Sequence, residues 1–113
     1  MQYLLLIYAN DTEWDSRSQE EQAAILKEYQ AVSATPGVTG GAQLEPATSA
    51  TTVRVQDGRT LVTDGPFVEA KEELGGFYLF EADNIDDAIG VAGRIPAART
   101  GAVEVRPLLD MAA

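Results

Sequence analysis

The spacing of hydrophobic and polar residues predicts a series of strands and helices along the whole chain. The first signal is the continuous apolar run of residues 3–8, which is typical of a strand covered on both faces. Such a strand belongs in the middle of a sheet. Helices would cover one of its faces, and the second cover could be a partner subunit.

A helix is predicted after residue 18. Residues 10–15 are polar apart from Trp14 and indicate a loop. Ser18 and Glu21 form a capping box, in which each side chain reaches a free backbone N–H group. Ile25, Tyr29 and Val32 then recur at helical spacing, and residues 35–37 (Thr-Pro-Gly) end the helix.

Three further strand signals follow. Residues 38–44 are strand-like but interrupted by Gly40-Gly41, which suggests a bulge or a close backbone approach. Residues 52–56 and 59–63 alternate around Asp57-Gly58, a favoured two-residue turn, and predict a hairpin. Residues 76–81 are aromatic and β-prone.

The second helix begins at a cap, Asp83 or Asn84, and ends before Pro96, with Arg94 suited to the negative end of the helix dipole. Its predicted apolar face consists of Ile85, Ala88, Ile89, Ala92 and Ile95. Residues 103–107 form a last, short strand.

This order, β-α-β-hairpin-β-α-β, predicts an α+β fold of ferredoxin-like topology with one extra hairpin. The length of 113 residues fits one domain, residues 1–113. Helices on a single face would leave the other face of the sheet apolar. We therefore expect a homodimer in which two sheets pack face to face, a dimeric α+β barrel.

Charge and hydropathy indicate which binding partners and which cellular location to expect for the protein. The formal net charge of −10 disfavours nucleic acid and anionic membranes. The apolar start is short and lacks both a basic segment before it and a small-residue cleavage site after it, so it is not typical of a signal peptide. No run approaches the roughly 20 apolar residues of a membrane span. We expect a cytoplasmic protein.

Histidine and cysteine are both absent. Their absence excludes a disulfide framework, a Cys/His zinc site and a cysteine nucleophile, and it removes the commonest general base near neutral pH. Carboxylates alone could hold magnesium or calcium, but nothing in the chain is spaced like an EF-hand. We expect no metal and no cofactor.

One long segment carries a family resemblance. Residues 50–67, which end in Asp64-Gly65-Pro66-Phe67, and residues 72–78, with Gly75-Gly76-Phe77, closely resemble the YCII-related proteins of the DGPF type. The opening strand and residues 103–108 match as well. The resemblance implies a dimeric α+β barrel of ferredoxin-like subunits. Proteins of this type are mostly of unknown function, and their genes often lie beside those of extracytoplasmic-function sigma factors.

Resemblance to the wider superfamily also implies a possible enzymatic activity. Its members are associated with a His–Asp pair, and one branch resembles a dehydrochlorinase of aromatic breakdown. This chain has no histidine, so only the aspartate can be carried over, and Asp64 matches it by motif.

Asp64 has two interpretations. In the structural one, its carboxylate forms an Asx-turn, Gly65 and Pro66 shape the turn, and Phe67 fills the core. In the functional one, Asp64 is a general base or ligand acceptor at the end of a strand, with Gly65, Pro66 and Phe67 beside it in a pocket.

Charged residues follow this turn, at Glu69, Lys71, Glu72 and Glu73. A solvated flap is the simpler interpretation. The alternative is a lid hinged at Gly75-Gly76, although a bulge at the start of a strand explains the glycines equally well.

Further candidates lie on the predicted strands and loops. Arg54 and Arg106 could clamp a carboxylate or phosphate, or pair with glutamates such as Glu104. Tyr8, Trp14 and Tyr78 could line a pocket with an apolar body and a polar tip, or belong to the core or dimer interface.

Three functions fit these observations. The leading hypothesis is a small-molecule-binding homodimer, regulatory or accessory, with its pocket between the sheet and the Asp64–Phe67 segment. The second is a cofactor-independent lyase, isomerase or dehydrochlorinase-like enzyme with Asp64 as base and Arg54 or a tyrosine holding the substrate anion. The third is a protein-interaction module linked to a sigma factor.

Overall fold

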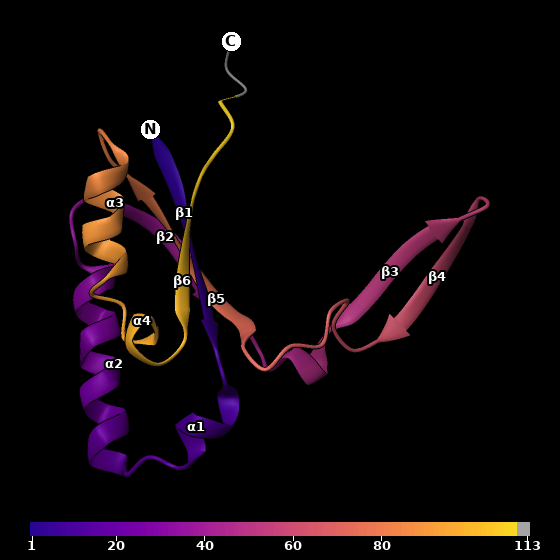
Figure 1. The fold of residues 1–113 in the computed structure, drawn as a ribbon, viewed down its shortest axis with the longest axis horizontal. Coiled ribbons are helices and arrows are strands. Elements are labelled where there is room, and N and C mark those ends of the chain that lie inside the picture. The colour runs from indigo at the N-terminus through magenta and orange to yellow at the C-terminus, as the bar shows by residue number, and fades with distance from the viewer. Residues whose placement is uncertain (111–113) are drawn as a thin grey trace.

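The computed structural model describes residues 1–110, which form a four-stranded body and a projecting two-stranded arm (Figure 1). The body's sheet has the order β2-β5-β1-β6 and is antiparallel throughout. This order confirms the predicted ferredoxin-like α+β topology with an added hairpin. The elements are β1 (Gln2–Ala9), α1 (Asp11–Asp15), α2 (Gln19–Ser33), β2 (Val38–Gln43), a 3-10 turn (Ala47–Ser49), β3 (Thr51–Gln56), β4 (Arg59–Asp64), β5 (Glu73–Glu81), α3 (Ile85–Ala92), α4 (Ala97–Thr100) and β6 (Ala102–Pro107).

Both long helices begin at the caps that the sequence indicates. The Ser18 hydroxyl oxygen accepts the Glu21 N–H at 3.1 Å, and the hydroxyl in turn donates to the Glu21 carboxylate at 3.2 Å. Asn84 Oδ1 accepts the Asp87 N–H at 3.1 Å and caps α3. The predicted loop at residues 10–15 is wrong, because residues 11–15 form the short helix α1.

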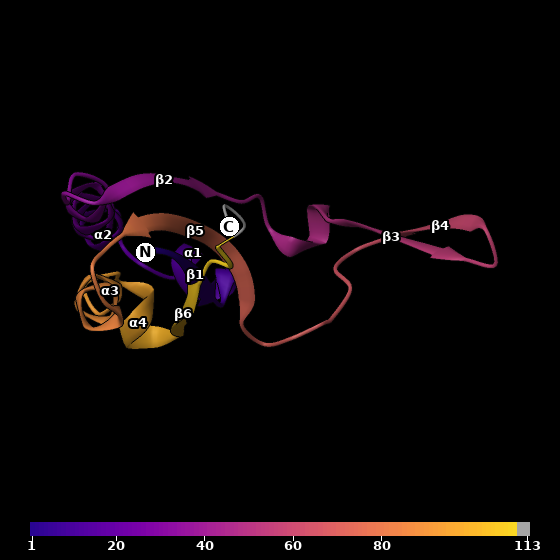
Figure 2. The same ribbon diagram turned by 90° about the horizontal axis from the view of Figure 1, so that it is seen from above.

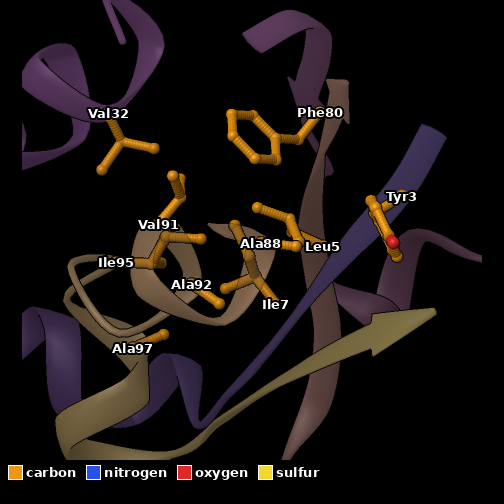
Figure 3. Close-up of a cluster of buried hydrophobic side chains, with 10 residues drawn as sticks. All are labelled: Tyr3, Leu5, Ile7, Val32, Phe80, Ala88, Val91, Ala92, Ile95 and Ala97. Carbon is orange, nitrogen blue, oxygen red and sulfur yellow. The ribbon is translucent and has the colours of Figure 1, made fainter. Parts of the chain in front are cut away.

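The core lies between the sheet and the helices, which cover one face of the sheet (Figures 2 and 3). Along β1, Tyr3, Leu5 and Ile7 are buried and alternate with half-buried neighbours, as a strand's side chains do. Full burial of a large apolar side chain stabilises a fold by about 1.5–3 kcal/mol. The other buried apolar residues come from α2, β5, α3 and the segment after it: Val32, Phe80, Ala88, Val91, Ala92, Ile95 and Ala97.

The apolar face of α3 differs from the prediction. Ile85 and Ile89 are 44% and 54% exposed, whereas Val91 is buried. Ala88, Ala92 and Ile95 are buried as expected. The helix ends at Ala92, before the expected stop. Pro96 does not follow a helix end but starts the short helix α4, a position that suits its fixed φ.

Gly41 and Gly76 let β2 and β5 approach each other closely. A Cβ on Gly41 would lie 2.6 Å from the Phe77 carbonyl oxygen, and one on Gly76 would lie 2.9 Å from that of Ala42. The β2–β5 register also shifts between Val38 and Gly40. These features confirm the bulge and the close approach predicted for the first glycine pair.

Gly75-Gly76 lies within β5 rather than before it. Gly75 occupies a register shift against β1, where Ile7 pairs with Gly76 and Tyr8 with Leu74. The pair therefore marks a bulge inside a strand, which favours the bulge interpretation over the hinge.

The arm consists of β3 and β4, joined by a tight turn in which Asp57 and Gly58 have φ values of 52° and 75°. Positive φ at both positions is the signature of a type I′ turn and confirms the predicted hairpin. The hairpin forms a separate sheet that projects away from the body (Figures 1 and 2). Accordingly, the radius of gyration is 16.2 Å, against about 13 Å for a compact chain of this length.

Candidate functional site

The sheet has one face without helices, which we call the open face. Register places on it Leu4, Leu6 and Tyr8 of β1, because their neighbours on the strand point into the core. Directly paired residues point to the same side of an antiparallel sheet. The open face therefore also carries Leu74, Phe77 and Leu79 of β5 and Glu104 and Arg106 of β6.

Glu104 stands out on this largely apolar face. Its Oε2 lies 2.5 Å from Nη2 of Arg106, two residues along the same strand. The contact is an ion pair without hydrogen-bond geometry: this oxygen is shielded from solvent and accepts no hydrogen bond from the residues that the structure describes. Arg106 is the one polar partner of this shielded oxygen among the described residues, and the Glu104 side chain as a whole is 40% exposed. Arg106 thus pairs with Glu104, as one of its two interpretations predicted.

Asp64 lies at the root of the arm. It is the last residue of β4, pairs with Thr51 and is exposed. Gly65 follows at φ 101°; its N–H donates to the Ala50 carbonyl at 2.7 Å, and its carbonyl accepts the Thr52 hydroxyl at 2.8 Å. Within residues 1–110 the Asp64 carboxylate accepts no hydrogen bond, so the hydrogen bonds of Gly65 with Ala50 and Thr52 define the turn.

Phe67 is not in the core, contrary to one expectation. Its side chain is 70% exposed, and the Arg54 guanidinium lies 5.4 Å from the centre of its ring. This distance is that of a cation–π contact. Pro66, between Gly65 and Phe67, is half-buried. Arg54, Asp64 and Phe67 are therefore grouped at the arm and its root.

Tyr78 and Trp14 lie elsewhere. Tyr78 is on the helix-covered face, where its hydroxyl donates to the Tyr29 carbonyl at 3.2 Å and accepts the Ser33 hydroxyl at 3.3 Å. Trp14 is half-buried in α1, and its carbonyl accepts Nε2 of Gln22 at 3.0 Å. The structure thus divides the predicted site residues among the open face (Tyr8), the helix-covered face, α1 and the arm.

Shallow depressions are present, but none of the predicted site residues lines them. One, of about 540 Å³, lies beside the start of α3 and is lined by acidic residues such as Asp83 and Asp86. Another, of about 340 Å³, lies at the tip of the arm. Over the described part of the chain, no group of three or more acidic side chains is placed to hold a metal ion.

The sequence indicates Glu104 only as a partner for arginines, although its alternation with Val103 and Val105 is compatible with a place on the uncovered side of the sheet. The shielding of its carboxylate oxygen depends on three-dimensional packing and has no sequence signal.

The fold and the open face together define an α+β protein of ferredoxin-like topology with one uncovered, mainly apolar sheet face. The model of the YCII-related domain matches residues 1–112, and the chain belongs to the YCII-related family. It is also similar to an uncharacterised protein of Rhizobium meliloti (strain 1021): the two are 39% identical over 114 residues, which cover 96% of this chain and 92% of that protein. No helix among the described residues is long and apolar enough to cross a membrane.

Proposed function

We propose that the protein is a small-molecule-binding homodimer whose ligand site lies on the open face. The observation that carries this proposal is the shielded Oε2 of Glu104, whose one polar partner among the described residues is the Arg106 guanidinium. A bound molecule with an N–H or O–H group would supply a further partner to this carboxylate. Ligand pockets of proteins are mostly apolar with a few polar groups that fix orientation, and the open face has this composition, although it needs a second surface over it to become a pocket.

The neighbours of Glu104 set the chemistry of the ligand. Leu6 lies directly opposite Glu104, and Tyr8 lies diagonally across the same strand pair. These side chains offer an apolar floor and a phenol. Arg106 keeps a largely exposed guanidinium beside the carboxylate, at 68% exposure. A small aromatic or aliphatic molecule with a cationic or amide donor suits this arrangement.

A second subunit would complete the site. An apolar sheet face that helices leave uncovered is stabilised when another sheet packs on it. Two open faces turned toward each other would exclude water from the region of Glu104. The Asp64-Gly65-Pro66-Phe67 motif supports assignment to the DGPF type within the family, whose dimeric barrel has this arrangement.

The enzyme and interaction-module hypotheses have less support. In the single chain, Asp64 is exposed at the root of the arm and lines neither of the two depressions described above. A regulatory or accessory role, including one linked to a sigma factor, is compatible with a binding homodimer but rests on the resemblance alone.

Thermal unfolding with small probes tests the site. We would compare benzylamine, benzamide and benzoate against the wild type, Glu104→Gln and the matched control Glu45→Gln, which alters an exposed glutamate outside the open face. A probe at about 100 times its dissociation constant should stabilise the wild type by roughly 2.7 kcal/mol. We expect benzylamine to stabilise the wild type and the control, and Glu104→Gln to lose the effect because the charge is gone.

Two outcomes contradict the proposal. One is equal stabilisation of Glu104→Gln and the wild type, which would place the probe elsewhere. The other is the absence of any shift with all three probes. Asp64→Asn, run in parallel, addresses the enzyme hypothesis: loss of probe binding in that variant would move the site to the arm root.

A further inference from the structure

Glu104 and Arg106 each stand at the end of an apolar row on the open face. Directly paired residues of neighbouring strands share a face of the sheet, so the register defines rows that run from β6 across β1 to β5. One row is Arg106, Leu4 and Leu79, and the adjacent row is Glu104, Leu6 and Phe77. A carboxylate and a guanidinium therefore lie side by side at the β6 edge of an apolar surface.

Both charged groups can accept a further partner. Nη2 of Arg106 lies 2.5 Å from Oε2 of Glu104, but a guanidinium carries five N–H donors in one plane. Arg106 is largely exposed and forms no ion pair with another carboxylate among residues 1–110. The Glu104 side chain is partly exposed, so an ammonium group can reach its carboxylate. Arg106 can thus bind a second carboxylate while it remains beside Glu104.

The pairing of opposite charges favours a ligand that carries both charges. An amine without a carboxylate would place a second cation beside Arg106, and a carboxylate without an amine would place a second anion beside Glu104. Like charges that are close together repel more strongly in a covered site than in water. A zwitterion with its ammonium at Glu104 and its carboxylate at Arg106 matches both groups and adds no net charge.

The apolar rows specify the rest of the ligand. Neighbouring strands are about 4.8 Å apart, so the apolar surface extends roughly 10 Å from β6 to β5. A side chain of the size of leucine or phenylalanine has the length to lie across Leu4 and Leu6. In an α-amino acid a single carbon carries the ammonium, the carboxylate and the side chain, so its three groups can meet the three features of the face together.

We infer that the open face binds a free α-amino acid with a large apolar side chain. Its ammonium contacts Glu104, its carboxylate contacts Arg106, and its side chain lies over the leucines of β1. The inference rests on the proposed function, because it uses the same site, and it identifies the class of ligand.

The test is isothermal titration calorimetry of the full chain with four matched probes: phenylalanine, phenylalanine amide, N-acetylphenylalanine and alanine. The amide lacks the carboxylate, the acetyl compound lacks the ammonium, and alanine lacks the ring. At about pH 6 the α-ammonium groups are protonated. We expect phenylalanine to bind at least about tenfold more tightly than each of the others, because each of them loses one group of contacts.

Variants then assign the contacts. Arg106→Gln should remove most of the preference for phenylalanine over its amide, and Glu104→Gln most of the preference over N-acetylphenylalanine. The matched control is Arg59→Gln, which alters an exposed arginine at the tip of the arm and should keep the wild-type order of probes. Far-UV circular dichroism reports whether each variant is folded, and the comparison of probes on the wild type needs no variant.

The outcomes separate this inference from the proposed function. Equal affinity of the wild type for phenylalanine and its amide overturns the zwitterion, and the proposed function then stands if benzylamine binding still requires Glu104. No binding of any probe, benzylamine included, overturns both. Loss of the preference in Arg59→Gln would place the ligand at the tip of the arm and also overturns the inference. The expected order of probes, lost in the two open-face variants alone, supports it.

Discussion

Arg99 of α4 binds Glu28 of α2 through both terminal nitrogens, with Nη1 2.8 Å from Oε2 and Nη2 3.0 Å from Oε1. This two-point contact suits the planar guanidinium and connects elements 71 residues apart in the chain. The hydrogen bonds from Arg99 hold the pKa of Glu28 below its ordinary value of 4.5.

Arg99→Gln should therefore change the acid stability of the protein. A carboxyl with a lowered pKa in the folded state contributes stability above its unfolded pKa and loses it as the pH falls through the folded pKa. We expect the melting temperature of the variant to lie slightly below that of the wild type at pH 6. The gap should shrink below pH 4.5. An equal gap at pH 6 and pH 3 would contradict this account.

Tyr29 should limit stability at the alkaline end. Burial raises the pKa of Tyr29 above its ordinary value of 10.0, and the nearby Tyr78 raises it further. A raised folded-state pKa means that the contribution is complete below pH 10 and is lost as the pH rises through the folded pKa. Tyr29→Phe should flatten the decline of urea-unfolding stability above pH 10. A decline as steep as that of the wild type would exclude Tyr29 as its cause.

Gly41→Ala should be much more destabilising than Gly40→Ala. The added Cβ at position 41 would meet the Phe77 carbonyl at 2.6 Å, whereas at position 40 the nearest atom is 4.0 Å away. Since backbone must move to accommodate the first change, we expect a loss of about 2 kcal/mol or more from Gly41→Ala in chemical denaturation. The adjacent position serves as the control. Equal losses would show that the close approach of β2 and β5 is not what requires glycine.

Thr52→Val should loosen the root of the arm. The change removes the 2.8 Å hydrogen bond from the Thr52 hydroxyl to the Gly65 carbonyl, which is worth about 1 kcal/mol. Thr63→Val, directly across the hairpin, is a matched control because the Thr63 hydroxyl forms no hydrogen bond with the residues that the structure describes. Hydrogen exchange over residues 50–66 should be faster in Thr52→Val than in the control. Identical exchange would mean that the bond does not hold the root.

The fold was predictable from the sequence because its local signals agree with one another. The apolar run of β1, the caps at Ser18 and Asn84, and the Asp57-Gly58 turn each point to the element that forms. The buried face of α3 was harder to predict. Ile85 and Ile89 precede Ala88 and Ala92 by three residues, and Val91 and Ile95 follow the same two alanines by three, so the pattern supports two overlapping apolar faces. Only the packing of the helix on the sheet selects between them.

The candidate site was less predictable because it depends on long-range placement. Arg54, Asp64 and Phe67 were expected beside the sheet, but their hairpin pairs only with itself. Alternation identifies a hairpin without saying whether it joins a larger sheet. Glu104 likewise became a candidate only when β6 was placed beside β1, which sets it opposite Leu6.

The order of the sheet has a consequence for cutting the chain in two. A break at the arm's tip, between Asp57 and Gly58, would give one fragment with β1 and β2 and another with β5 and β6. In the order β2-β5-β1-β6, strands of the two fragments alternate strictly, so neither fragment can form this sheet without the other. The two halves should therefore be unfolded alone and fold on mixing. The two fragments therefore form a split protein, whose reassembly can report the proximity of two molecules fused to them.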